Sequence, residues 1–297
     1  MKLLITGAFK CAEENLKSIA ELGNEIVFMQ NESEELPCDY GEVEGVICNG
    51  LFLHHDIEKF SSLKYIQLTS AGLDRVPLDY INRKGIKLYN AAGVYSAPMA
   101  EFALCGVLDL YKRSRFFAEN QKAHKWEKHR NILELCGKTV SIIGCGSVGR
   151  ECAKRFSAFG TTVLGVDIVK PEGDLFCQYF PIKNIKAALR LSDIVILTLP
   201  LNDSTRYMFD EDMLSELKDG CLLVNISRGA VIKEEALISA LKCGNLSGAV
   251  LDVFEEEPLS PDNPLWDMET VILTPHNSFV GEGNGQRLFE AVYRNLV

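Results

Sequence analysis

Three side chains that could act together on an anionic substrate follow apolar stretches in the second half of the sequence. Arg228 follows the run CLLVNIS, Glu257 ends the stretch GAVLDVFEEE, and His276 follows VILTP. An arginine grips a carboxylate through two charge-assisted hydrogen bonds, and a histidine exchanges a proton near neutral pH. A carboxylate beside the histidine favours its protonated form. These residue types suit the reduction of a keto acid beside a hydride donor.

The three residues need a scaffold that brings separate segments together, and the sequence predicts a parallel sheet. Apolar runs of strand length alternate with helix-like segments, a pattern that is typical of βαβ units. The carboxyl ends of parallel strands share one edge of the sheet, where ligands bind. We therefore expect the three side chains to lie at one sheet edge. The strand candidates of this half are KTVSIIG, TTVLGVD, IVILTLP, CLLVNIS, GAVLDV and VILTP.

The stretch GCGSVG follows the first of these strands directly and opens a helix, the context that a dinucleotide-binding fingerprint requires. Gly144 allows a tight turn, Gly146 lets the backbone approach a pyrophosphate, and Gly149 permits close packing of the helix on the strand. The residues of this stretch that we expect at the cofactor are Gly144, Gly146, Ser147, Val148 and Gly149.

The acidic residue at the end of the next strand indicates which dinucleotide binds. A carboxylate at Asp167 accepts hydrogen bonds from the adenosine ribose and repels a 2′-phosphate. We therefore expect NAD(H). NADP(H) is the less favoured alternative, which Lys170, three residues on, supports.

The overall composition excludes several classes of partner. Lys and Arg number 31 against 41 Asp and Glu, which gives a formal charge of −10 and argues against nucleic acid or an anionic membrane. The ten cysteines contain no C-x-x-C pair, which indicates a reducing compartment, and no stretch has the length of a membrane span. We expect a cytoplasmic protein. We also expect no metal site, with the histidine pairs His54/His55 and His124/His129 at the surface or at a cleft rim.

The chain of 297 residues suits two domains. The first part alternates five strand candidates with helix candidates near residues 11–22, 56–62 and 77–84. A long helical stretch from Ala97 to Glu119 precedes the second series, and residues 281–297 form one more helix. The first strand candidates are KLLITGA, EIVFMQ, GVICNG, YIQLTSAG and KLYNAA.

Several longer stretches resemble the D-isomer-specific 2-hydroxyacid dehydrogenase family, and the resemblance covers nearly the whole chain. It implies an α/β fold of two doubly wound parallel-sheet domains. One is a Rossmann NAD-binding domain, residues 96–276, and the other is a discontinuous, flavodoxin-like substrate domain, residues 1–95 and 277–297. The stretches are NISRGAVIKEEALISAL, LSGAVLDVFEEEPLSPDNPLW, VILTPHNS, GCGSVG, LPLNDSTR and TSAGLDRV.

The resemblance also implies roles for individual residues and a homodimer. Arg228 binds the carboxylate and carbonyl of a small 2-keto or 2-hydroxy acid, Glu257 pairs with His276, and His276 is the acid/base. Asp252 and Pro200 contact the cofactor, and backbone groups of Ala71 and Gly72 hold the substrate carboxylate. The family members include D-lactate, glycerate, hydroxypyruvate and phosphoglycerate-type enzymes.

Two other functions fit the same sequence features. Some relatives of this fold act as NADH-responsive binding proteins in transcription, and an oxyanion such as phosphite could replace the keto acid. Formate is disfavoured, because relatives that act on it carry Gln where this chain has Glu257. The substrate side chain is open as well: the residues at 51–53 favour an apolar substituent, whereas Arg75 would suit a phosphate. Many members also carry His or Cys where this chain has Thr198.

Overall fold

The computed structural model describes residues 1–297, and the chain divides into two compact units. Unit 1 comprises residues 1–95 and 281–297, and unit 2 comprises residues 96–280. The second boundary between the two units falls after Val280, whereas the sequence analysis places it between His276 and Asn277. Residues 277–280 stay with unit 2 because the backbone N–H groups of Asn277 and Ser278 donate hydrogen bonds to the carboxylate of Asp252.

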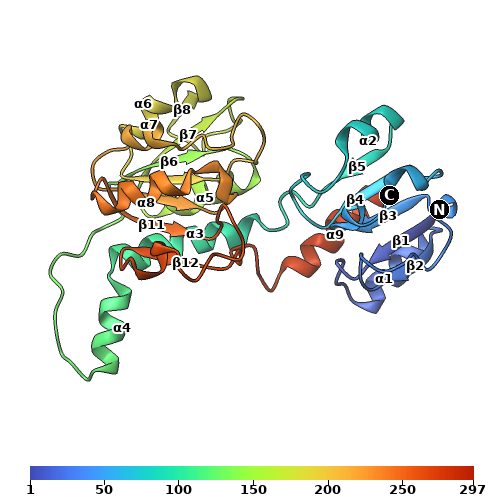
Figure 1. Ribbon diagram of the computed structural model, residues 1–297, viewed down its shortest axis with the longest axis horizontal. Helices are drawn as coiled ribbons and strands as arrows, with labels where there is room; N and C mark the ends of the chain where they lie inside the picture. Colours follow the sequence, from blue (N-terminus) through green and yellow to red (C-terminus); the bar gives the residue numbers. More distant parts are fainter. The chain divides into compact units, whose positions relative to one another are not determined.

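Unit 1 is built on a parallel five-stranded sheet in the order β2-β1-β3-β4-β5 (Figure 1). This is the strand order of flavodoxin-like domains, as predicted. Its strands are β1 (Lys2–Thr6), β2 (Glu25–Met29), β3 (Gly45–Cys48), β4 (Tyr65–Leu68) and β5 (Lys87–Tyr89). Its helices are α1 (Glu13–Glu21), α2 (Leu78–Lys84) and α9 (Asn284–Leu296), with 3-10 turns at Tyr40–Glu42, Leu51–Leu53 and Ile57–Lys59. The helix predicted near 56–62 is thus only a 3-10 turn.

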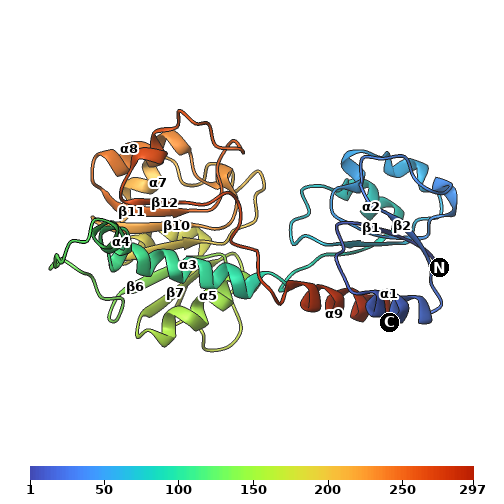
Figure 2. The same cartoon turned by 90° about the horizontal axis from the view of Figure 1, so that it is seen from below.

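The terminal helix α9 belongs to unit 1, although the rest of that unit lies at the other end of the sequence. Leu288 and Val292, one helical turn apart, are buried against the sheet together with Leu3, Ile5 and Ile47. Figure 2 shows α9 beside α1 on the same face of the sheet. An amphipathic helix needs such an apolar surface to be stable.

Unit 2 contains a parallel seven-stranded sheet in the order β12-β11-β10-β9-β6-β7-β8. Counted from β6, the order is that of a Rossmann sheet extended at one edge, with its topological switch point between β6 and β9. The strands are β6 (Thr139–Ile143), β7 (Thr162–Asp167), β8 (Gln178–Pro181), β9 (Ile194–Leu197), β10 (Cys221–Asn225), β11 (Leu246–Leu251) and β12 (Val271–Leu273).

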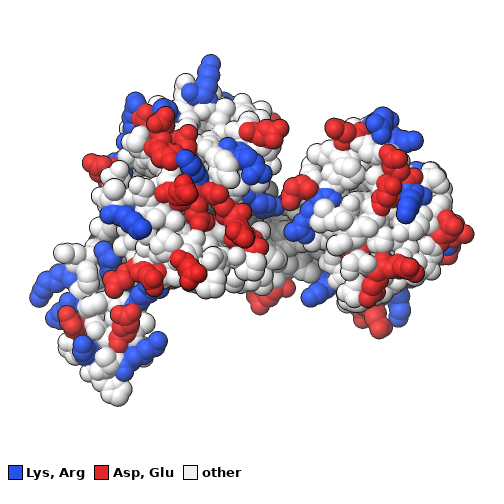
Figure 3. Space-filling model, in the orientation of Figure 1, with Lys and Arg blue, Asp and Glu red and all other residues white.

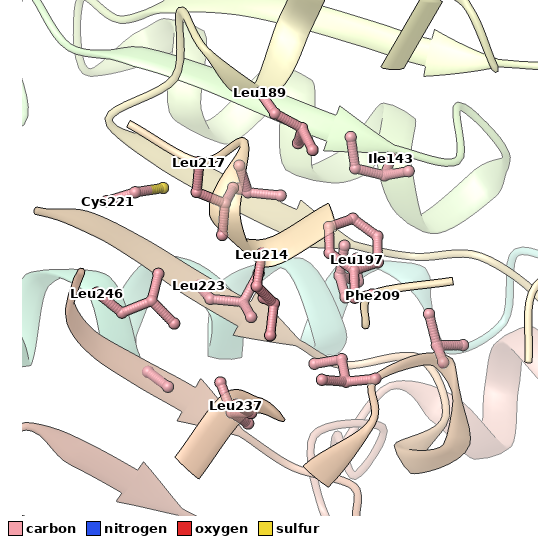
Figure 4. Close-up of a cluster of buried hydrophobic side chains, with 14 of the residues drawn as sticks. Ile143, Leu189, Leu197, Phe209, Leu214, Leu217, Cys221, Leu223, Leu237 and Leu246 are labelled. Atoms are coloured by element: carbon pink, nitrogen blue, oxygen red, sulfur yellow. The ribbon is translucent and has the colours of Figure 1, made fainter. Parts of the chain in front are cut away.

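Helices cover both faces of this sheet, so its central strands are buried and mostly apolar. One face packs on α3 (Ser96–Tyr111) and α5 (Ser147–Ala158). The other face packs on α6 (Ile185–Leu189), α7 (Glu211–Ser215) and α8 (Glu234–Lys242). Figure 4 shows the buried side chains between the sheet and α6, α7 and α8, where Phe209 lies among leucines of the strands and helices. Shorter 3-10 turns occur at Ile182–Asn184, Gly229–Val231 and Pro264–Asp267.

The long helix predicted from Ala97 to Glu119 is two helices. Arg113 adopts a left-handed conformation with φ 55°, which ends α3 and starts α4 (Ser114–Lys122) in a new direction. Figure 1 shows α4 and the chain that follows it projecting from the body of unit 2 as an arm. We refer to residues 112–133 as the arm. No helix in the structure is long and apolar enough to cross a membrane.

Candidate active site

The three predicted catalytic residues lie after three adjacent strands of unit 2. Arg228 follows β10, Glu257 follows β11 and His276 follows β12. All neighbouring strands in this sheet are parallel, so the loops after them share one edge. The expectation that these segments meet at a single sheet edge therefore agrees with the topology.

His276 and Glu257 are in direct contact. The Nδ1 atom of His276 lies 2.8 Å from Oε2 of Glu257, and about a third of each side chain is exposed (37 % and 36 %). A carboxylate can only accept a hydrogen bond, so Nδ1 carries the hydrogen and Nε2 is the nitrogen that can exchange a proton with a ligand. The second oxygen, Oε1 of Glu257, accepts from the backbone N–H of Phe254 at 3.1 Å. The carboxylate is thereby held at both oxygens.

Asp252 fixes the loop that carries the histidine. Its side chain is fully buried and accepts hydrogen bonds from the hydroxyl of Thr274 and the backbone N–H groups of Asn277 and Ser278. The backbone carbonyl of Asp252 accepts from the N–H of His276 at 2.8 Å. A buried carboxylate needs such donors. The partners of the Asp252 side chain all lie in the histidine loop. Asp252 therefore already holds this loop, and any contact with the cofactor would be a second role.

Arg228 lies in a turn that side chains of the same segment stabilise. Asn225 is buried and its side-chain amide donates to the carbonyl of Arg228 at 3.0 Å, while its oxygen accepts from the N–H and hydroxyl of Ser227. One guanidinium nitrogen of Arg228 donates to the carbonyl of Ser227 at 2.8 Å. The guanidinium is therefore partly oriented by its own backbone.

The glycine following Arg228 brings two loops into backbone contact. A Cβ atom on Gly229 would lie 1.8 Å from the carbonyl carbon of Phe254 and 2.5 Å from the nitrogen of Glu255. No side chain fits in this space. The loop after β10 thus rests directly on the loop that carries Glu257.

The glycine stretch lies at the topological switch point, between the ends of β6 and β9. Gly144 has φ +102°, and a Cβ there would meet the backbone of Thr198 at 3.0 Å. A Cβ on Gly149 would lie 2.0 Å from the carbonyl oxygen of Gly144, whereas one on Gly146 would meet nothing within 4 Å. Gly146 therefore borders open space at the first turn of α5, where backbone N–H groups attract phosphate.

The hydroxyl of Thr198, at the position where the resemblance implies His or Cys in many members, has a structural role here. It donates to the carbonyl of Gly144 at 2.6 Å and so ties the end of β9 to the glycine turn. Pro200 lies just beyond, and its carbonyl accepts from the hydroxyl of Thr205 at 2.7 Å. Ser147 is exposed and Val148 is half-buried at the start of α5.

Asp167 ends β7 next to this turn, as the sequence predicts. Oδ2 accepts from the backbone N–H of Cys145 at 2.6 Å, and Oδ1 accepts from that of Ile168 at 2.6 Å. The carboxylate is therefore fixed beside the glycine stretch, with lone pairs left for further donors. These residues fit the adenosine and pyrophosphate parts of a dinucleotide.

In unit 1, Ala71 and Gly72 lie in the loop after β4. The carbonyl of Ala71 accepts from the side-chain amide of Asn90 at 2.8 Å, and that of Gly72 accepts from the hydroxyl of Ser70 at 3.2 Å. The N–H groups of Ala71 and Gly72 donate to no group of the chain. Both are thus available to an acceptor such as a carboxylate.

Two sequence expectations about other residues need correction or addition. His55 is buried, not at the surface: its ring lies 2.9 Å from the hydroxyl of Tyr40 and 2.8 Å from the carbonyl of Glu32, which secures a loop of unit 1. The structure contains no group of three or more His, Cys, Asp or Glu side chains placed to hold a metal ion. Glu255, to which the sequence analysis assigns no role, has two hydrogen-bond partners in neighbouring segments.

Comparison with known proteins assigns the chain to a family. Residues 104–278 match the family described as D-isomer specific 2-hydroxyacid dehydrogenase, NAD binding domain. The chain belongs to the D-isomer specific 2-hydroxyacid dehydrogenase family and is an NAD-binding oxidoreductase of that family.

Its relatives are similar in sequence and in structure. A hydroxypyruvate reductase of Thermotoga maritima is 36 % identical over 247 residues, which cover 81 % of this chain and 80 % of that protein. A glyoxylate reductase of Korarchaeum cryptofilum is 32 % identical over 253 residues, covering 82 % and 75 %. A crystal structure of D-lactate dehydrogenase from Aquifex aeolicus complexed with NAD and lactic acid is 27 % identical, with a TM-score of 0.79 and coverage of 99 % and 94 %. The predicted family, fold class and enzyme class are confirmed.

Proposed function

We propose that the protein is an NAD(H)-dependent reductase of a small 2-keto acid, which it interconverts with the D-2-hydroxy acid. The observation that carries this proposal is the 2.8 Å contact between His276 and Glu257 beside the loop of Arg228. The names of the relatives as hydroxypyruvate and glyoxylate reductases support it. The test is oxidation of NADH in the presence of 2-keto acids, followed by nicotinamide absorbance.

In the reductive direction, His276 and Arg228 divide the work. The bound cofactor supplies the hydride that the keto carbon receives. His276 gives the proton on Nε2 to the keto oxygen, while Glu257 at Nδ1 stabilises the charged imidazole and fixes its tautomer. Arg228 binds the substrate carboxylate and stabilises the developing charge on the oxygen. In oxidation the same residues work in reverse, and His276 takes the hydroxyl proton.

The substrate carboxylate has a second set of donors in this proposal. The free N–H groups of Ala71 and Gly72 bind it, as the family resemblance implies. Replacement of Gly72 by Pro removes one donor without adding charge. This substitution raises the KM for the keto acid and leaves the affinity for NADH near that of the wild type.

Gly144, Gly146, Ser147, Val148, Gly149, Asp167, Pro200 and Asp252 form the proposed cofactor site. The fixed carboxylate of Asp167 favours NAD(H) over NADP(H), because it accepts from ribose hydroxyls and repels a phosphate. A related D-isomer specific 2-hydroxyacid dehydrogenase from Xanthobacter autotrophicus Py2, 25 % identical with a TM-score of 0.81 over 99 % of this chain and 94 % of that one, was solved with NADPH and MES. Solved relatives therefore contain either NAD or NADPH, and the comparison of NADH with NADPH is a necessary part of the assay.

We further propose that the protein is a homodimer that associates through the arm. Within the arm, Trp126 is 98 % exposed, and Phe117 and Leu133 are exposed as well, so the arm offers apolar side chains that a second copy would cover. The arm carries two acidic residues and seven basic ones, unlike the acidic chain as a whole: Lys112, Arg113, Arg115, Lys122, Lys125, Lys128 and Arg130. In Figure 3 red side chains gather over the middle of unit 2, whereas the arm at lower left carries several blue ones. Light scattering should give twice the chain mass of 33.0 kDa, and a monomer would contradict the proposal.

A further inference from the structure

We propose that Glu255 is a positioning residue for the pair of Glu257 and His276, an inference that rests on the proposed function of that pair. Its carboxylate holds the loop after β11 to two neighbouring segments of unit 2. The loop can then present Glu257 to His276 in one fixed place. Glu255 itself does not touch His276 in the structure and has no proposed contact with substrate.

The evidence begins with the two partners of the Glu255 carboxylate. Oε1 accepts from the backbone N–H of Glu234, the first residue of α8, at 2.5 Å. Oε2 accepts from the hydroxyl of Tyr207 at 3.3 Å. Tyr207 lies in the segment between β9 and α7, and Glu234 follows the loop of Arg228. One carboxylate therefore joins three segments that are far apart in the sequence.

The local sequence of α8 explains why this acceptor is needed. Lys233 occupies the N-cap position, and a lysine side chain has no acceptor for the first N–H groups of a helix. The carboxylate of Glu255 fills this role from outside the helix. Its negative charge also lies at the positive end of the α8 dipole.

Backbone contacts also hold the same three segments together. The N–H of Tyr207 donates to the carbonyl of Ala230 at 2.7 Å, and the N–H of Lys233 donates to the carbonyl of Phe209 at 3.0 Å. Gly229 rests on the peptide between Phe254 and Glu255. The loop of Arg228 therefore contacts both the segment of Tyr207 and the loop after β11. Glu255 adds side-chain hydrogen bonds to these backbone contacts.

The three consecutive glutamates at 255–257 differ in their partners. Glu257 meets His276, Glu255 meets Tyr207 and Glu234, and the exposed Glu256 between them makes no hydrogen bond or ion pair. Glu256 is accordingly a matched control with the same charge in the same loop.

The test compares Glu255→Ala, Glu255→Gln, Tyr207→Phe and Glu256→Ala. The first readout is the pH titration of the His276 ring by NMR in the protein without added ligand, with the signal assigned by its loss in His276→Ala. The second readout is the pH profile of kcat/KM with the best keto acid. The NMR readout does not depend on turnover, so it tests Glu255 even if the proposed reaction is wrong.

We expect Glu255→Ala to move the midpoint of the His276 titration to lower pH and to reduce kcat about tenfold, since small misplacements of reacting groups cost this much or more. Glu255→Gln keeps an acceptor and should retain most of the wild-type behaviour. Tyr207→Phe changes no charge at neutral pH and should shift the midpoint in the same direction by a smaller amount. Glu256→Ala should change neither readout.

Two results would overturn the proposal. Equal shifts in Glu255→Ala, Glu255→Gln and Glu256→Ala, with none in Tyr207→Phe, would show that only the charge of the loop matters. A lower melting temperature in Glu255→Ala with an unmoved titration and pH profile would show a purely structural role. If Glu255→Ala does not fold, Tyr207→Phe replaces it in both measurements. An unmoved titration and pH profile in Tyr207→Phe would then overturn the proposal.

Discussion

The backbone N–H of His276 donates to the backbone carbonyl of Asp252 across 2.8 Å, which joins the ends of β11 and β12 directly. The carboxylate of Asp252 secures the next two residues of the histidine loop. His276 itself has a left-handed backbone with φ 49°. A non-glycine residue adopts this conformation uncommonly, and here the hydrogen bonds to Asp252 hold the backbone in it, while the contact of Nδ1 with Glu257 orients the imidazole.

Loss of the guanidinium should affect the substrate and not the cofactor. In Arg228→Gln we expect kcat/KM for the keto acid to fall about 100-fold, which corresponds to roughly 3 kcal/mol of charge-assisted hydrogen bonding. The affinity for NADH, measured by fluorescence titration, should stay near the wild-type value. Arg190→Gln, which removes an arginine paired with Glu216 at the surface, is the control. A matching loss of NADH affinity in Arg228→Gln would mean that the arginine serves the cofactor.

Loss of charge at Glu257 should shift the pH dependence. In Glu257→Gln the neutral amide no longer stabilises a protonated imidazole, so we expect the optimum for keto-acid reduction to move to lower pH. Steady-state rates between pH 5 and 9 would measure the shift, with Glu256→Gln as the neighbouring control. An optimum at the wild-type pH would remove Glu257 from this role.

Asp167 should control the choice of cofactor. Asp167→Asn keeps one side-chain oxygen, which can accept from only one of the N–H groups of Cys145 and Ile168, and removes the charge that repels a 2′-phosphate. The ratio of kcat/KM with NADPH to that with NADH should then rise about tenfold, equivalent to roughly 1.4 kcal/mol. A wild-type enzyme that already prefers NADPH would contradict the proposed cofactor.

Two of the three glycines of the glycine stretch, Gly149 and Gly146, should respond differently to alanine. A methyl group at Gly149 would lie 2.0 Å from a carbonyl oxygen, so Gly149→Ala should lower the melting temperature by roughly 5–10 °C, as overpacking by about 2–3 kcal/mol implies. Gly146→Ala has open space and should fold normally while binding NADH more weakly. Equal NADH affinity in Gly146→Ala and wild type would show that the backbone there does not meet the cofactor.

Cys145 should be chemically inert although it lies within the glycine stretch. Burial, together with the charge of Asp167, raises the pKa of its thiol to about 12, so almost no thiolate exists at pH 8. Iodoacetamide at that pH should label the exposed Cys177 and Cys243 and leave Cys145 unmodified, as peptide mass spectrometry would show. Rapid labelling of Cys145 would indicate that the turn opens in solution.

The sequence predicts those parts of the fold and site that local patterns determine. The strand ends that carry Arg228, Glu257 and His276 follow from apolar runs, and the glycine stretch follows from its position between a strand and a helix. The meeting of His276 with Glu257 could be expected because parallel strands end at one edge.

Features that depend on tertiary contacts could not be predicted in the same way. The apolar pattern of residues 97–119 is helical throughout, and only the left-handed Arg113 divides it. His55 is polar but buried, because Tyr40 and Glu32 supply partners that are distant in sequence. Glu255 and Glu256 look alike in an acidic run, and only the positions of Tyr207 and α8 distinguish them.

The most direct test of the proposed function is NADH oxidation against glyoxylate, pyruvate, hydroxypyruvate, phosphohydroxypyruvate and branched 2-keto acids, with His276→Ala measured in parallel. We predict turnover of at least one small keto acid by the wild type, and a loss of at least about 100-fold in His276→Ala, the range expected for a general acid. NADH binding should be equal in both proteins. Tight NADH binding without turnover of any keto acid, or full activity in His276→Ala, would contradict the proposed reaction.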